Sequence, residues 1–147
     1  MSKKLDIDFI DIDKEIENKL GMKISKIFEK KGERYFREIE EDFTLKILNR
    51  NNIVVSLGGG AFLNSKIKKE VLDNHISFWL NWSIKTLINR IKDSQKRPVA
   101  FNASKNELTE LIKKRSIVYS KAMYRIDCEN LTKNEIVKNI LKIYETH

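Results

Sequence analysis

Arginine is the scarcer basic residue in this chain, in which Lys and Arg together number 29. The seven arginines are Arg34, Arg37, Arg50, Arg90, Arg97, Arg115 and Arg125. A planar guanidinium binds a carboxylate or a phosphate through two parallel hydrogen bonds, which a lysine ammonium cannot do. Any single arginine can equally be an ordinary surface residue. Arg97, next to Pro98 in a segment without regular periodicity, is the best candidate for a mobile anion contact.

Two aspartates, Asp11 and Asp13, follow a short segment in which apolar and acidic residues alternate. The period of two places both carboxylates on one side of the chain, where they could orient a metal-bound water and a substrate hydroxyl. The alternative is structural: Asp13 caps the following helix and Asp11 is solvated. An isolated Asp-x-Asp pattern favours this second interpretation.

Three consecutive glycines, residues 58–60, follow the apolar segment 53–57 and make up three of the five glycines in the chain. Without side chains, their backbone can approach a ligand closely and donate N–H groups to it. A plain turn between a strand and a helix is the alternative. Because a turn does not require three glycines, we favour the ligand-binding interpretation.

Other reactive or aromatic side chains receive no site role from the sequence. Phe78, Trp79 and Trp82 are expected at the core or its boundary rather than in a stacking platform. His75 has no partner at metal-ligand spacing, and Cys128 is the single cysteine. An internal disulfide is therefore excluded, which fits a reducing compartment, and we expect a cytoplasmic protein.

Periodicity predicts alternating strands and helices. Strands are expected at residues 7–11, 53–57, 75–80 and 124–127, and helices at residues 14–20, 25–30, 33–50, 64–72, 83–91, 104–122 and 132–144. The spacing Ser-x-x-Glu at Ser104 and Thr-x-x-Glu at Thr132 indicates a capping box at the start of each of the last two helices. We predict an α/β fold, with a parallel sheet covered by helices on both faces.

The size and charge of the chain narrow the functional classes. Its 147 residues, without a linker or a repeat, predict a single domain over residues 1–147, and we expect a monomer. The apolar runs are too short for a membrane helix.

The net charge of +8 could indicate a polyanionic partner, but the lysines are mixed with acidic residues, so we expect no nucleic-acid binding. Salt-sensitive retention of DNA or RNA would support that alternative.

Taken in order, five segments resemble shikimate kinase: residues 9–13 (FIDID), 32–40 (GERYFREIE), 57–61 (LGGGA), 97–98 (RP) and 115–119 (RSIVY). Each segment alone is commonplace, but the ordered set covers nearly the whole chain. The resemblance implies a three-layer P-loop-kinase-like fold of the nucleoside-monophosphate-kinase type. It also implies ATP-dependent phosphorylation of the 3-hydroxyl of shikimate, a step toward chorismate and the aromatic amino acids.

The resemblance also implies roles for residues at the substrate. Asp13 would hold the hydroxyls of shikimate and act as the catalytic base. Arg37 and Arg115 would bind the shikimate carboxylate, and Gly59 and Gly60 would donate backbone N–H groups to it.

On the ATP side, the resemblance implies that Asp11 lies near Mg²⁺ and that Arg90 packs on adenine. Arg97 would come from the lid that closes over the phosphates and would take part in catalysis. Phosphoryl transfer depends mainly on positioning and charge neutralisation, for which arginines and magnesium are suited.

One departure from the family concerns the phosphate-binding loop, since no G-x-x-x-x-G-K-[ST] motif occurs in the 147 residues. The family's first strand would lie between the strands ending at Leu57 and Leu80, so we expect exposed strand edges and low stability.

We hypothesise a start codon placed too late or a truncated gene, which the upstream DNA would decide. The alternative is a non-catalytic fragment that at most binds shikimate, or that serves as an interaction module, and that releases no ADP on addition of shikimate. Ile117 also replaces a proline common in the family.

Overall fold

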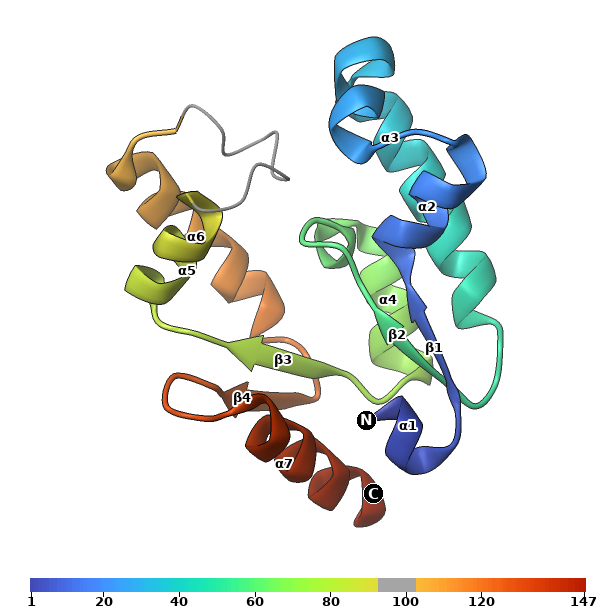
Figure 1. Ribbon diagram of the computed structural model, residues 1–147, viewed down its shortest axis with the longest axis vertical. Helices are drawn as coiled ribbons and strands as arrows, with labels where there is room; N and C mark the ends of the chain where they lie inside the picture. Colours follow the sequence, from blue (N-terminus) through green and yellow to red (C-terminus); the bar gives the residue numbers. More distant parts are fainter. Residues whose placement is uncertain (93–102) are drawn as a thin grey trace. The chain divides into compact units, whose positions relative to one another are not determined.

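The computed structural model describes residues 1–92 and 103–147, which form two compact units, Met1–Asn74 and His75–His147 (Figure 1). Each unit is described by itself below. The residues around Arg97 and Pro98, at positions 93–102, fall outside the described residues. Arg97 therefore lies outside them as well.

The first unit is built on two parallel strands, β1 (Asp8–Asp11) and β2 (Ile53–Ser56). Asp8 is paired with Ile53, and Asp11 with Ser56. Because the strands are parallel and in this register, their carboxyl ends lie at the same edge of the sheet (Figure 1). The acidic residues after β1 and the glycines after β2 therefore emerge side by side.

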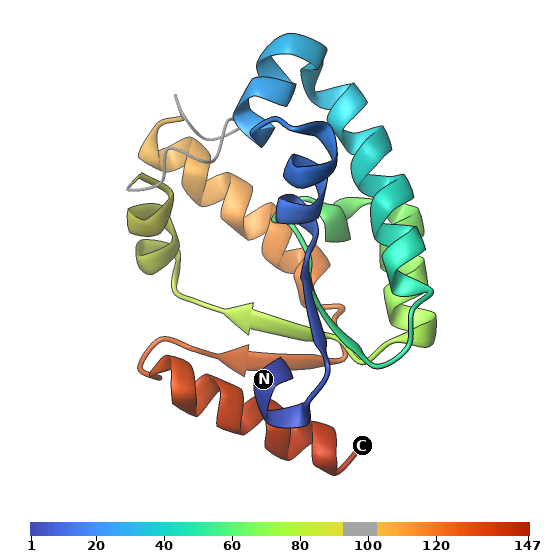
Figure 2. The same ribbon diagram turned by 45° about the vertical axis from the view of Figure 1, so that its right-hand side comes forward.

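Helices connect these strands where three were predicted, at residues 14–20, 25–30 and 33–50, and the last two form one element with a break at Gly32. Helix α2 (Ile12–Leu20) begins directly after β1 and ends at Gly21. Helix α3 (Ile24–Leu48) is interrupted at Gly32, whose φ of 83° and ψ of 166° are open almost exclusively to glycine. The two helices pack against each other (Figure 2).

The core of the first unit is formed by buried residues of β1, α2 and α3: Ile10, Ile12, Ile16, Ile27 and Phe36. After β2 the chain forms the 3₁₀-helix η1 (Ala61–Leu63) and helix α4 (Ser65–Asn74), which complete the unit. Asn64 caps α4, since its Oδ1 accepts hydrogen bonds from the backbone N–H groups of Lys66 and Ile67 at 2.9 and 3.1 Å. A short helix, α1 (Ser2–Leu5), precedes β1.

The second unit also holds two parallel strands, β3 (Phe78–Asn81) and β4 (Tyr124–Asp127). Its helices are α5 (Ile84–Lys92), α6 (Lys105–Tyr119) and α7 (Lys133–Glu145). Ser104 and Thr132 both form the predicted capping boxes. Helices α5 and α6 pack together through Ile88, Leu108 and Ile112.

Instead of one continuous parallel sheet the structure has two, which agrees with the exposed strand edges expected between the strands ending at Leu57 and Leu80. Within the described residues the strands form two separate sheets, with the orders β1-β2 and β3-β4. Each strand thus has a single partner, and Ile53, Val54 and Val55 of β2 are half-buried rather than buried. A parallel strand becomes fully buried when it is paired on both edges and covered on both faces.

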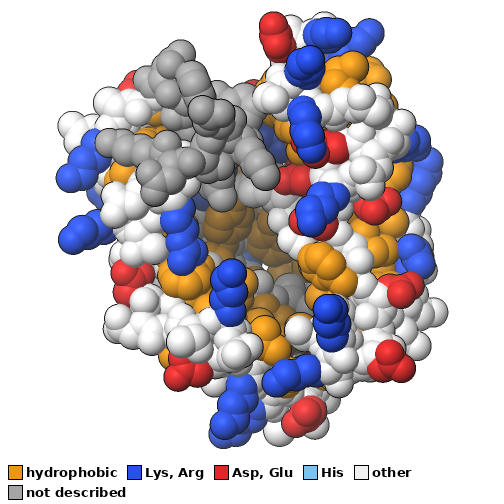
Figure 3. Space-filling model, in the orientation of Figure 1, with side chains coloured by type: hydrophobic (Ala, Val, Ile, Leu, Met, Phe, Trp, Pro, Cys, Tyr) orange, Lys and Arg blue, Asp and Glu red, His pale blue; other side chains and the backbone are white. Residues whose placement is uncertain are grey.

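Two properties of the described residues concern the membrane and the distribution of charge on the surface. No helix in residues 1–92 and 103–147 combines the length and the apolarity required to cross a membrane. On the face that Figure 3 draws, the Lys and Arg side chains are interspersed with Asp and Glu rather than gathered in one basic stripe. Such mixing is typical of a solvated surface.

Candidate functional site

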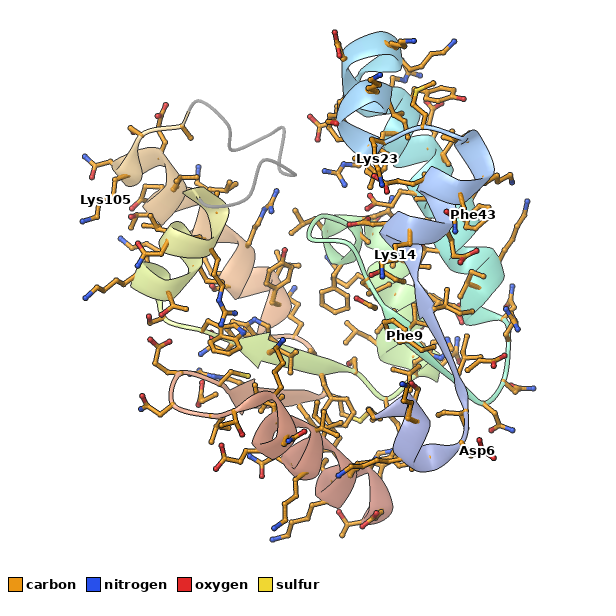
Figure 4. The ribbon with its side chains drawn as sticks, viewed as in Figure 1. Asp6, Phe9, Lys14, Lys23, Phe43 and Lys105 are labelled. Carbon is orange, nitrogen blue, oxygen red and sulfur yellow. The ribbon has the colours of Figure 1, made fainter. Side chains whose placement is uncertain are left out.

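Asp11 and Asp13 lie at the junction of β1 and α2, and they have different structural roles. The Asp11 carboxylate accepts a hydrogen bond from the backbone N–H of Lys14 at 3.2 Å and so caps α2. Figure 4 shows Lys14 at the start of this helix and Phe9 on the preceding strand. The interpretation in which Asp13 caps this helix is wrong, because Asp13 lies within the first turn of α2.

Asp13 is half-buried, and its pKa is raised from 3.8 to about 6. Burial is the main cause, followed by the negative charges of Glu40, Asp11 and Glu17, while Arg37 acts in the opposite direction. At pH 7 such a group is ionised in roughly nine molecules of ten. A carboxylate with a pKa just below the working pH is suited to accept a proton from a substrate hydroxyl.

Arg37 is held on α3 by two carboxylates of the same helix. Its Nη1 donates to Glu40 Oε2 at 2.6 Å, and its Nε and Nη2 each lie 3.3 Å from Glu33 Oε1. The side chain of Glu40 is buried, whereas Glu33 is exposed. These i,i+3 and i,i+4 spacings place all three residues on one face of the helix.

Aromatic rings complete the support for the guanidinium. The Cζ atom of Arg37 lies 5.3 Å from the ring centroid of Phe36 and 6.0 Å from that of Phe28. The two rings contact each other, with centroids 4.9 Å apart. Arg37 is therefore restricted by charge and by packing before any ligand binds.

The glycine segment after β2 passes directly against these charged groups. A Cβ atom on Gly58 would overlap the Asp13 carboxylate and would lie 3.1 Å from Glu40 Oε1. A Cβ atom on Gly60 would overlap the Arg37 guanidinium. Gly59, between them, is exposed. A side chain at Gly58 or Gly60 would therefore have to displace one of these charged groups.

Asp13, Arg37, Glu40 and the glycines thus form one cluster in the first unit. Glu40 was not singled out from the sequence, where it is one of many acidic residues. A signal was nevertheless present, because Glu40 lies four residues after Phe36 and eight before Leu48, on the stripe of α3 that is buried. A glutamate in such a stripe requires a partner, and Arg37 is three residues away.

The remaining predicted site residues that the structure describes belong to the second unit. Arg115 is half-buried on α6. Arg90, on α5, is exposed, and its Cζ lies 3.7 Å from the centroid of the Trp82 ring. The roles expected for Arg90, Arg115 and Arg97 stay predictions.

The donor groups expected for magnesium are few. Within the described residues no group of three or more His, Cys, Asp or Glu side chains could hold a metal ion. Mg²⁺ is commonly held by one or two carboxylates together with substrate phosphates and water. Asp11, at the carboxyl end of β1 and close enough to Asp13 to raise its pKa, fits such a site.

Comparisons with known proteins point to one family. The family model described as shikimate kinase matches residues 1–145. The shikimate kinase of a Sulfurihydrogenibium species is 40% identical over 141 residues, covering 96% of this chain and 84% of the relative. That of Bacillus subtilis is 37% identical over 148 residues, covering 97% and 77%.

Solved structures agree with these sequence relatives. Shikimate kinase from Acinetobacter baumannii in complex with shikimate superposes with a TM-score of 0.92 at 27% identity, covering 99% of this chain and 82% of that one. The Aquifex aeolicus shikimate kinase gives a TM-score of 0.86 at 32% identity, covering 98% and 84%.

Proposed function

The chain belongs to the shikimate kinase family, and we propose that it transfers the γ-phosphoryl group of ATP to the 3-hydroxyl of shikimate. This reaction is a step toward chorismate and the aromatic amino acids. The observation that carries the proposal is the cluster of Asp13, Arg37 and Glu40 beneath the glycine segment. The cluster offers a proton acceptor and an anion-binding group side by side.

Shikimate has one carboxylate and three hydroxyl groups, which match the charges of this cluster. Arg37 would bind the carboxylate, and the Asp13 carboxylate would accept hydrogen bonds from the hydroxyls. Backbone N–H groups of Gly59 and Gly60 would add donors for the ligand. Arg115 would supply the second guanidinium for the shikimate carboxylate.

Asp13 would also act as the base of the reaction. The O–H bond of the 3-hydroxyl breaks as its proton passes to the Asp13 carboxylate, and the oxygen forms a bond to the γ-phosphorus. The bond from that phosphorus to the bridging oxygen breaks, and ADP leaves with the electron pair. The pKa of about 6 keeps Asp13 able to accept the proton at neutral pH.

Groups on the nucleotide side would neutralise the charge of the phosphates. Asp11 would hold Mg²⁺, which supplies positive charge to the phosphate oxygens when it is bound. Arg97 would contact the phosphates, and Arg90 the adenine. Phosphoryl transfer gains most of its acceleration from such positioning and electrostatics.

For the whole chain we propose a single shikimate-kinase-like domain over residues 1–147, monomeric, with the three-layer architecture of P-loop kinases. The mixed α/β composition and the short parallel sheets support the proposed architecture. In that architecture, the first strand of the family would lie between β2 and β3.

Calorimetric titration with shikimate, combined with coupled detection of ADP release, tests the proposal. We expect binding at one site and ADP release that depends on shikimate. Arg37→Lys should weaken shikimate binding by about tenfold, since an ammonium cannot form the two parallel hydrogen bonds. Arg34→Lys is the matched control, because Arg34 is exposed and pairs with Glu38 at the surface.

The outcomes separate the alternatives. Shikimate binding that Arg37→Lys weakens, without any ADP release, would favour a non-catalytic shikimate-binding module. Absence of heat on titration would refute both the kinase and the binding module. Equal effects of the two Arg→Lys substitutions would refute the role given to Arg37.

A further inference from the structure

Trp82 and Arg90 form a stacked pair in the second unit. Trp82 follows Asn81, the last residue of β3, and Arg90 lies on α5, the helix that begins just beyond this strand (Figure 1). The Cζ atom of Arg90 is 3.7 Å from the centroid of the Trp82 ring. The pair therefore lies at the carboxyl end of a parallel strand, which is where α/β proteins bind nucleotides.

The contact restricts Arg90 without neutralising it. A separation of 3.7 Å places the guanidinium in van der Waals contact with the ring face, where the electron-rich π system attracts the cation. Within the described residues Arg90 makes no ion pair. The nearby Glu129 carboxylate already accepts hydrogen bonds from Ser83 N, Ser83 Oγ and Thr86 Oγ1 at 2.8, 2.9 and 2.7 Å.

Arg90 is exposed, and the indole of Trp82 lies against one face of its guanidinium. A planar cation with one covered face and one open face is a stacking surface for another flat ring. Nucleobases stack on arginine guanidinium planes and on aromatic rings with useful energy and little dependence on hydrogen bonding. The family resemblance already implies that Arg90 packs on adenine; the part played by Trp82, which was placed at the core boundary, was not expected.

We propose that Trp82 is a positioning residue for the nucleotide base: it holds Arg90 flat, so that the open guanidinium face stacks on the adenine ring of ATP. The inference rests on the proposed function, because that function supplies the adenine nucleotide. Trp82 acts through Arg90 and does not touch the reacting atoms. Its contribution is to fix, before binding, an arginine side chain that would otherwise sample many rotamers.

The geometry favours a base over a phosphate as the partner of this pair. Phosphate binds to the N–H edge of a guanidinium, which an arginine can present to a phosphate in many orientations, so a ring beneath the face contributes little to that contact. A base binds to the face, whose orientation Trp82 fixes. The dependence of affinity on Trp82 should therefore appear with ADP and be absent with inorganic tripolyphosphate, which carries no base.

Calorimetric titrations of ADP and of tripolyphosphate into four variants test this inference. Arg90→Ala should weaken ADP binding by about tenfold, in the range measured for loss of a stacking partner. Trp82→Leu should weaken it by about two- to fivefold, as for an exposed cation–π contact, and Trp82→Phe should recover part of that loss. The double variant Trp82→Leu/Arg90→Ala should bind ADP no more weakly than Arg90→Ala alone.

Trp79→Phe is the matched control, because Trp79 lies on β3 and its ring is 5.3 Å from Arg125 rather than near Arg90. It also leaves Trp82 as the sole tryptophan, since the chain has two. The fluorescence of this variant should change on addition of ADP, and the change should disappear when Arg90→Ala is added.

Several results would overturn the inference. They are an absence of ADP binding, an ADP affinity unaffected by Trp82→Leu, additive effects in the double variant, and an equal loss of tripolyphosphate affinity. Shikimate titrations of the same proteins distinguish the two proposals. Intact shikimate binding with no role of Trp82 in ADP binding would refute this inference and leave the proposed function standing.

Discussion

Replacing Asp13 by asparagine should make the protein more stable at neutral pH. The carboxylate is half-buried, and burial together with the neighbouring Glu40 raises its pKa from 3.8 to about 6. The native protein therefore holds a negative charge at this position less readily than the unfolded chain does. An asparagine side chain would occupy nearly the same volume without that charge.

The size of the stability gain from Asp13→Asn, and its dependence on pH, follow from the shift in the pKa of Asp13. A pKa of about 6 instead of 3.8 corresponds to about 3 kcal/mol if solvent does not screen the charge. Because the Asp13 side chain is partly exposed, we reduce this to about 1 kcal/mol. Between pH 3.8 and about 6 the native state binds more protons than the unfolded state, so wild-type stability falls as the pH rises through this window. The gain from Asp13→Asn should be complete above about pH 6 and absent below about pH 4.

Urea denaturation followed by circular dichroism at several pH values between about 4 and 8 measures this effect. Asp13→Asn should raise the midpoint by about 0.5 M at pH 7 and leave it unchanged near pH 4. Asp42→Asn, an exposed residue on α3, makes the same chemical change and should have little effect at any pH. A stability gain independent of pH, or a loss at pH 7, would refute the electrostatic reasoning.

Three further substitutions test the rest of the structure. Glu40→Gln should lower the free energy of unfolding by about 2 kcal/mol, because it removes the buried countercharge of Arg37. The control Glu33→Gln, at the exposed partner of Arg37, should cost less than about 0.5 kcal/mol. Equal urea midpoints for the two variants would contradict this. Gly60→Ala should weaken shikimate binding about tenfold in calorimetry with the circular dichroism spectrum unchanged, since its Cβ overlaps the Arg37 guanidinium. Ser104→Ala should cost about 1 kcal/mol in thermal unfolding by removing the cap of α6, and no change would mean that the cap is dispensable.

Local features of the fold could be predicted from the sequence because their causes are local. The capping boxes at Ser104 and Thr132 satisfy backbone N–H groups within one turn of the chain. The interruption of α3 at Gly32 also follows from one residue, whose backbone conformation glycine alone tolerates. Strand pairing is not local: the alternation of strands and helices predicted one sheet, and the break between β2 and β3 in the described residues was expected only from the family resemblance.

The site was predicted in part for the same reason. Asp13, Arg37 and Gly60 belong to motifs that can be read along the chain, and the structure brings them together. Glu40 was missed because its importance comes from burial, which depends on the packing of α3. Trp82 was assigned to the core boundary because its partner, Arg90, is eight residues away on the next helix.

The acidic residues around Asp13 explain why one cluster can be unfavourable for stability and useful for proton transfer. Glu40 and Asp11 raise the pKa of Asp13 by repulsion, after the larger effect of burial, while Arg37 limits the rise. A carboxyl group with a pKa near 4 would be a weaker base, and one with a pKa well above 7 would be protonated at neutral pH. With a pKa of about 6, Asp13 is mostly ionised at neutral pH. Removing the Glu40 charge should therefore move the acidic limb of the pH–rate profile to lower pH.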